Sequence, residues 1–122
     1  MYKKELVMTH QGSCHCGGIR FEVEGEPEQA LSCNCSICQR KGALLWFLPR
    51  SKLRLLTPVE NMATYTFNKH VIKHHFCPVC GIHPFGEGVT PDGTQMAAVN
   101  IRCMEEINLD AVPVEHFDGR AL

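Results

Sequence analysis

The sequence predicts a mostly β protein with small sheets and very little helix. Short segments that alternate apolar and polar residues recur along the chain, and such alternation is typical of half-buried strands. Apolar residues at helical spacing are scarce. Seven of the eight cysteines lie in three tight clusters, which indicates that bound metal contributes to the stability of the fold.

The first predicted strands lie at residues 19–24 and 43–48. Three apolar residues alternate with charged ones in the first segment. The second segment is a continuous apolar run that Pro49 stops, which is typical of a buried strand. We therefore expect Trp46 and Phe47, which lie inside this run, to belong to the core.

The second half of the chain predicts more strands and one hairpin. Proline and glycine in the segment Pro91-Asp92-Gly93-Thr94 favour a turn. The strands on its two sides are therefore expected to pair as a hairpin. Short helices are expected at residues 36–42 and 105–109. The remaining strand patterns lie at residues 52–56, 63–67, 71–76, 85–87 and 95–103.

Composition and charge exclude several classes of protein. The 122 residues fit a single domain, 1–122, with its core between about residues 12 and 120. The formal net charge is −1, and seven thiolates with two zinc ions would lower it to about −4. We therefore expect no nucleic-acid partner. No segment approaches the length of a membrane span, and the apolar run Leu6-Val7-Met8 is too short for a signal peptide. These observations predict a cytoplasmic protein.

Two cysteine pairs at opposite ends of the chain make one full set of zinc ligands. They are Cys14 with Cys16, and Cys77 with Cys80, and a glycine follows each pair. The two-residue spacer of the second pair lets both sulfurs reach one ion, while the glycine permits a turn that aims amides at sulfur. A structural zinc on these four cysteines is predicted.

The third cluster, Cys33, Cys35 and Cys38, offers three soft ligands and lacks a fourth. A catalytic zinc keeps such a position open, whereas a structural zinc would take a fourth ligand from elsewhere. Cys103 is one candidate, but it continues an apolar face and is expected to pack in the core. The other candidates are histidines near the second cysteine pair, expected beside the metal or at the surface: His74, His75 and His83.

Disulfides are the alternative explanation for the clusters. A bridge between Cys14 and Cys16, or between Cys33 and Cys35, would close a very tight ring. Residues two apart in an extended chain point to the same side, which suits two thiolates that bind one ion. Metal binding is therefore the favoured interpretation.

An open site of three thiolates favours a thiol as its incoming ligand, because soft ligands suit such a site better than hydroxide does. Arg40 and Lys41 follow the cluster directly and would hold the carboxylates of an anionic thiol. The alternative is that both residues belong to a solvated basic face.

These clusters resemble the glutathione-dependent formaldehyde-activating enzyme family, which includes centromere protein V. The resemblance rests on the segments 12–18, 33–41 and 76–81, together with the tail at 99–120. It implies a β-tent-like fold, a structural zinc on Cys14, Cys16, Cys77 and Cys80, and a catalytic zinc on Cys33, Cys35 and Cys38.

The resemblance also implies an activity, namely the joining of formaldehyde to glutathione as S-hydroxymethylglutathione. The enzyme is classed as a carbon–sulfur lyase in the reverse direction. A handler of related glutathione adducts is included in this hypothesis. The alternative hypothesis is a zinc-stabilised protein-binding module without catalysis. Many members of the family have a serine before the glycine that follows the cysteine triplet, whereas this chain has Lys41 before Gly42.

Overall fold

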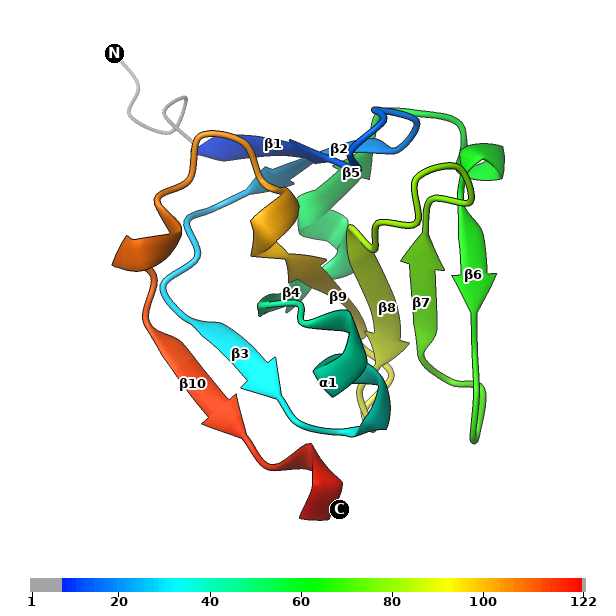
Figure 1. The fold of residues 1–122 in the computed structure, drawn as a ribbon, viewed down its shortest axis with the longest axis vertical. Helices are drawn as coiled ribbons and strands as arrows, with labels where there is room; N and C mark the ends of the chain where they lie inside the picture. The colour runs from blue at the N-terminus through cyan, green and yellow to red at the C-terminus, as the bar shows by residue number, and fades with distance from the viewer. Residues whose placement is uncertain (1–7, 122) are drawn as a thin grey trace.

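The computed structural model describes residues 8–121, and its architecture is mostly β, as predicted (Figure 1). The strands form two sheets, one of three strands and one of seven. Most of the apolar run 6–8, which was judged too short for a signal peptide, lies outside the described residues. Among the helices of the described part, none is long and apolar enough to cross a membrane.

The smaller sheet is antiparallel, with the order β1-β2-β5. The predicted strand at 19–24 is β2 (Arg20–Glu24), and the one at 52–56 is β5 (Leu53–Leu55). β1 (Thr9–Ser13) was not expected, because its residues are mostly polar and show no apolar alternation.

The larger sheet has the order β10-β3-β4-β9-β8-β7-β6. The predicted hairpin is confirmed as β8 and β9, joined by a turn in which Gly93 has a φ of 91°. All pairs in this sheet are antiparallel except β3 and β10, which run parallel with Phe117 opposite Cys33. The bounds are β3 Ala30–Cys33, β4 Leu45–Pro49, β6 Ala63–Tyr65, β7 Lys73–Phe76, β8 Phe85–Val89, β9 Gln95–Asn100 and β10 Val114–Phe117.

The hydrophobic core lies between the two sheets. Phe21 and Val23 of β2 are fully buried and pack with Phe85 and Val99 of the larger sheet. The rings of Phe21 and Phe85 meet edge to face, with centroids 6.0 Å apart. Because alternate residues of a strand point to opposite faces, the other face of the larger sheet is left outside this core.

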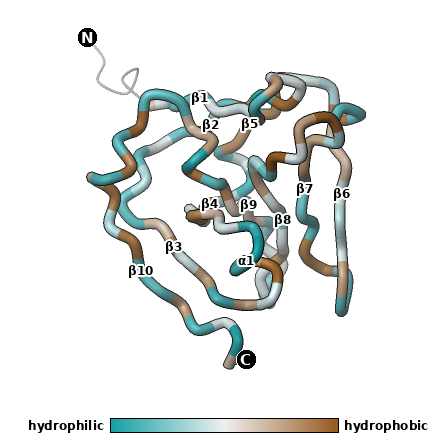
Figure 2. The backbone as a smooth tube through the Cα atoms, in the orientation of Figure 1, coloured by the Kyte–Doolittle hydropathy of each residue, from teal (hydrophilic) through white to brown (hydrophobic). Residues whose placement is uncertain are grey.

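One helix, α1 (Ser36–Lys41), was predicted and is present, and the C-terminal half of it is hydrophilic (Figure 2). Gly42 ends it with a left-handed φ of 69° and donates its amide to the carbonyl of Cys38. The helix expected at 105–109 is wrong: Glu106 has a φ of 57°, which breaks a right-handed helix, and only a short 3-10 turn follows at Leu109–Ala111.

The expectation for Phe47 is also wrong. Trp46 packs against the core with Leu48, but the side chain of Phe47 is 50% exposed. The reason is the period of two in β4, which turns Phe47 to the face opposite the core. An apolar run by itself does not distinguish a strand buried on both faces from one buried on a single face.

Candidate metal centres

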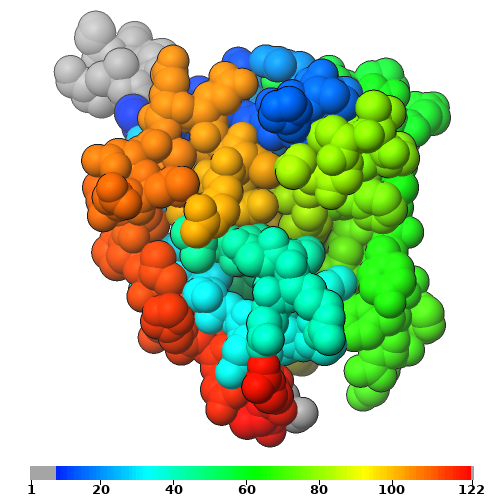
Figure 3. All heavy atoms as spheres, viewed as in Figure 1, coloured from blue at the N-terminus to red at the C-terminus, as the bar shows by residue number. Residues whose placement is uncertain are grey.

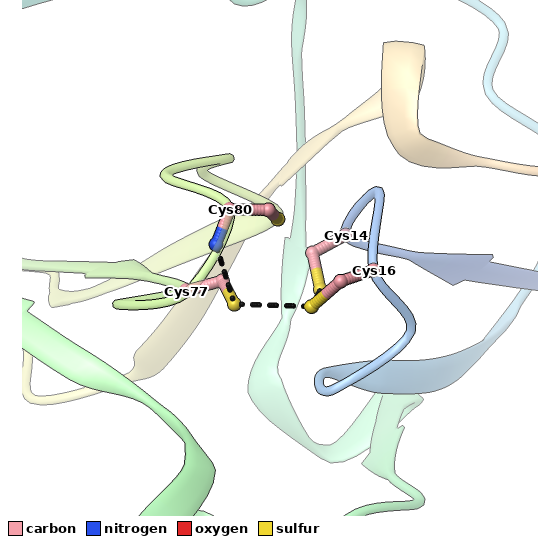
Figure 4. Close-up of side chains that lie close together, drawn as sticks. All are labelled: Cys14, Cys16, Cys77 and Cys80. Atoms are coloured by element: carbon pink, nitrogen blue, oxygen red, sulfur yellow. Dashed lines mark hydrogen bonds between the residues drawn. The ribbon is translucent and has the colours of Figure 1, made fainter.

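The four cysteines at opposite ends of the chain meet at one point. Cys14 and Cys16 follow β1, Cys77 and Cys80 follow β7, and their side chains point toward one another (Figure 4). All four sulfurs lie within 4.8 Å of one another. The Cys16 sulfur is 3.7 Å from that of Cys14 and 3.5 Å from that of Cys77. Tetrahedral zinc separates its thiolate sulfurs by about 3.8 Å, which is close to these two distances, so the cluster fits a zinc ion.

Backbone amides around this cluster favour the thiolate form. The amide of Ile19 donates to the Cys14 sulfur at 3.3 Å, and the amide of Cys80 donates to the Cys77 sulfur at 3.4 Å. A backbone hydrogen bond from Ile82 lowers the pKa of Cys80 to about 6. Such donors offset part of the negative charge that four thiolates bring together. The chemistry of the donor set therefore suits a divalent cation.

The second centre consists of Cys33, Cys35 and Cys38, whose sulfurs also lie within 4.8 Å of one another. Cys33 ends β3, Cys35 caps α1 and Cys38 lies inside it, so one continuous segment supplies all three. Among residues 8–121, no histidine, cysteine or carboxylate completes this set. The arrangement has three thiols and no fourth protein ligand in the part of the chain that the structure describes.

Cys103 belongs to neither centre. Its sulfur lies 3.7 Å from the carbonyl oxygen of His83, and its side chain packs against the edge of the core. Burial raises the pKa of its thiol to about 11. This placement matches the expected packing role.

The C-terminal segment, red in Figure 3, lies against the cyan segment of the chain that carries the triplet. The side-chain amide of Asn34 donates to Asp118 at 2.9 Å, and its oxygen accepts from the backbone amide of Arg120 at 2.9 Å. Gly119 lies so close that a Cβ there would meet the Cys33 sulfur at 2.5 Å. The glycine is required by this close approach to the triplet.

Beside the triplet, a cavity of about 290 Å³ opens on the face of the larger sheet that is remote from the core. Its lining is mostly apolar, and the polar exceptions at the end near Cys38 include Lys41, His74 and His83. Arg40 is not part of this lining; its guanidinium donates to the carbonyl of Ser36 at 2.8 Å on the outside of α1. Of the two predicted cationic contacts, only Lys41 lies in this cavity.

Lys41 is held between the two histidines. Its Nζ lies 3.3 Å from Nδ1 of His74 and 3.2 Å from Nε2 of His83. Because Nδ1 of His83 donates to the carbonyl of His75, Nε2 of His83 must accept from the ammonium. Burial lowers the pKa of Lys41, and burial with the charge of Lys41 lowers the pKa of each of His74 and His83 to about 4. Both imidazole rings are therefore neutral at neutral pH.

The sequence analysis considered His74 and His83 as possible fourth ligands of the triplet, although their neighbours in the sequence are Cys77 and Cys80. The structure places both rings in the cavity beside the triplet, but neither belongs to its converging set of ligand atoms. The strand period assigns His74 to the cavity face, while His75 turns the other way and pairs with Glu87 at 2.9 Å. That alternation was visible in the sequence, but the cavity to which it points was not.

Comparisons with known proteins agree with these observations. The chain matches the model of the family described as glutathione-dependent formaldehyde-activating enzyme over residues 9–117. It is also similar to a crystal structure of a Rhodobacter sphaeroides protein, with 34% sequence identity and a TM-score of 0.74. That match covers 86% of this chain and 99% of the other. The resemblance found in the sequence is thereby confirmed, and the chain belongs to the glutathione-dependent formaldehyde-activating enzyme family.

Proposed function

We propose that this chain is a zinc-dependent enzyme that joins the thiol of glutathione to formaldehyde or a related small aldehyde. The product is S-hydroxymethylglutathione or its analogue, and the reverse reaction is that of a carbon–sulfur lyase. One observation carries the proposal: three converging thiols without a fourth ligand among residues 8–121 adjoin a cavity that contains the half-buried amino group of Lys41. The family supports the substrate pair of glutathione and formaldehyde.

Cys33, Cys35 and Cys38 would hold the zinc of the reaction. When bound there, zinc would accept a thiol as its fourth ligand and favour the thiolate form of that thiol. The amide of Cys35 donates to the Cys33 sulfur at 3.4 Å, which supports a charged donor set. A reducing compartment such as the cytoplasm, where glutathione is abundant and cysteines stay free, suits both partners.

Lys41 would stabilise the negative charge that develops on the aldehyde oxygen. An ammonium has three N–H donors, and two of those on Lys41 are directed to His74 and His83. The third remains for a substrate oxygen beside Cys38. A donor already held in position costs little reorganisation when charge develops, which is how such groups lower a barrier.

The other four cysteines would bind a structural zinc. They join segments separated by some 60 residues and leave no position for a substrate, because all four ligands are protein thiols. Their role would be to support the fold that positions the triplet.

Cobalt substitution tests the proposal. Zinc and cobalt would be counted per chain, and glutathione would then be titrated into the cobalt-loaded protein while its visible spectrum is recorded. We expect two metals per chain and a spectral change that saturates with glutathione and is lost in Cys35→Ser. A spectrum indifferent to glutathione would contradict the enzyme and favour the protein-binding module.

A further inference from the structure

One face of the larger sheet is hollow because its central positions carry almost no side chain. Phe47, Ala98 and Gly86 lie opposite one another across β4, β9 and β8. His74 of β7 pairs with Gly86 and ends this row. In the next row, Gly88 lies opposite Met96. Glycine and alanine leave the middle of the face empty, while larger residues stand around it.

The walls of this hollow are apolar and accessible. The side chain of Phe47 is 50% exposed, and Ile72 and Val89, which also line the cavity, are 55% and 51% exposed. An engineered apolar cavity of about 150 Å³ holds one benzene molecule. At about 290 Å³, this one has room for a larger apolar group. A one-carbon aldehyde would leave most of it empty.

The triplet also borders a second pocket, whose lining is more polar. This pocket of about 410 Å³ is bounded by Cys33 and Cys38 together with Arg102, His116 and Asp118. Glutathione carries two carboxylates and one ammonium, so its peptide matches such polar and charged groups. Desolvating these charged groups in the apolar cavity would be costly, because Lys41 is the cation that this cavity offers to the two carboxylates. Cys38 lines both spaces and marks the point where they meet.

We propose that the apolar cavity binds the carbon substituent of the aldehyde, so that the substrate class is glutathione adducts of aldehydes with an apolar chain or ring. The glutathione peptide then lies on the polar side, and the reacting carbon lies between the two beside Cys38. This inference rests on the proposed function and deepens it. What it adds is the size and polarity of the aldehyde.

The reaction balances without an oxidant. The sulfur of glutathione adds to the carbonyl carbon, one C–S bond forms, and the π electrons of the C=O bond move to the oxygen. The thiol loses a proton and the oxygen gains one, so the product is an S-(1-hydroxyalkyl)glutathione. The ammonium of Lys41, at the Cys38 end of the cavity, is placed to donate to that oxygen.

A series of S-alkylglutathiones tests the inference by binding alone, since these thioethers keep the peptide and cannot react. Calorimetry on the zinc-loaded protein would compare S-methyl-, S-propyl- and S-hexylglutathione. Burial of one methylene strengthens binding by about threefold to fourfold, so we expect at least a roughly hundredfold gain from methyl to hexyl.

A variant that fills the cavity provides the second measurement. Ala98→Leu places a larger side chain in the hollow, and we expect it to weaken S-hexylglutathione about tenfold while leaving S-methylglutathione unchanged. Ala111→Leu, at an exposed site away from the cavity, is the matched control. The series on the unchanged protein remains decisive if Ala98→Leu does not fold.

Two outcomes would overturn the inference, and they differ in what they say of the proposed function. Equal affinity across the series, with glutathione still changing the cobalt spectrum, overturns the apolar subsite and leaves the thiol-binding enzyme standing. No spectral change with glutathione and no binding of any S-alkylglutathione overturns both.

Discussion

Both cysteine clusters consist of thiol ligands, but they differ in which segments of the chain supply these ligands. The four-cysteine cluster joins distant segments and has two almost fully buried members, Cys14 and Cys77, although its Cys16 is exposed. The members of the triplet are all partly exposed and lie within six residues of one another. A metal held by distant segments restrains the fold as a whole. A metal held by one short segment restrains only that segment.

The surroundings of the two clusters differ in the same way. The four-cysteine cluster has Ile19 buried against it, and this residue also supplies an amide to sulfur. The triplet instead adjoins an apolar cavity and a polar pocket, with Lys41 beside it. Closure by protein ligands suits a structural metal, and access from two sides suits chemistry.

Loss of one ligand from each cluster should have the largest effect and the greatest contrast. We expect Cys80→Ser to abolish cooperative unfolding, because structural zinc sites contribute about 10–16 kcal/mol in small peptides, as much as the whole stability of many domains. Cys35→Ser should melt within a few degrees of the unchanged protein and lose thiol binding. Circular dichroism melting with metal analysis measures both. Equal melting temperatures for the two variants, each still binding thiol, would remove the distinction between the clusters.

The cysteine clusters and the strand pattern were predictable because each depends on local sequence. Cysteine spacing indicated both clusters, and both converge in the structure. Alternation located β2 and β5 because one face of each is buried. It failed for β10, whose four residues are all exposed and therefore carry no apolar period.

The cavity was not predictable, because it results from register between strands. Gly86 and Ala98 lie twelve residues apart in the sequence, and only the pairing of β8 with β9 places them side by side. The position of Lys41 between two histidines depends on the docking of α1 against β7, which no local pattern encodes. Long-range pairing therefore decides what the triplet faces.

Removal of the ammonium tests whether the triplet differs from the other cluster in chemistry as well as access. We expect Lys41→Met to lower kcat/KM for adduct formation about a hundredfold, since a positioned donor contributes at least that much. Stability should hardly change, because methionine keeps the apolar stem and removes a half-buried charge. Lys69→Met, at an exposed site, is the control. Unchanged kinetics in Lys41→Met would leave the ammonium without a role in the reaction.

Gly119→Ala should weaken metal binding at the triplet alone. The added Cβ would lie 2.5 Å from the Cys33 sulfur and must displace it or the C-terminal segment. We expect zinc affinity at the triplet to fall about 10- to 100-fold, the usual cost of disturbing groups around metal ligands. Competition with a chelator would measure both sites. Gly88→Ala, whose Cβ meets nothing closer than 3.8 Å, should leave both affinities unchanged. Equal loss at both sites would indicate a general destabilisation.

The smallest expected effect concerns the protonation of the histidines around Lys41. The pKa values of His74 and His83 are each lowered to about 4, chiefly by burial, so both rings should stay neutral from pH 8 down to pH 5. In the unfolded chain both would take up protons below about pH 6.5, so these two groups make the protein less stable as the pH falls from about 6.5 to 4. Histidine proton resonances of the zinc-loaded protein, assigned with His74→Phe and His83→Phe, should show two rings that do not titrate between pH 8 and pH 5. Titration of either ring near pH 6.5 would mean that water solvates the end of the cavity at Lys41. The surroundings of the triplet would then not differ from an ordinary solvated surface.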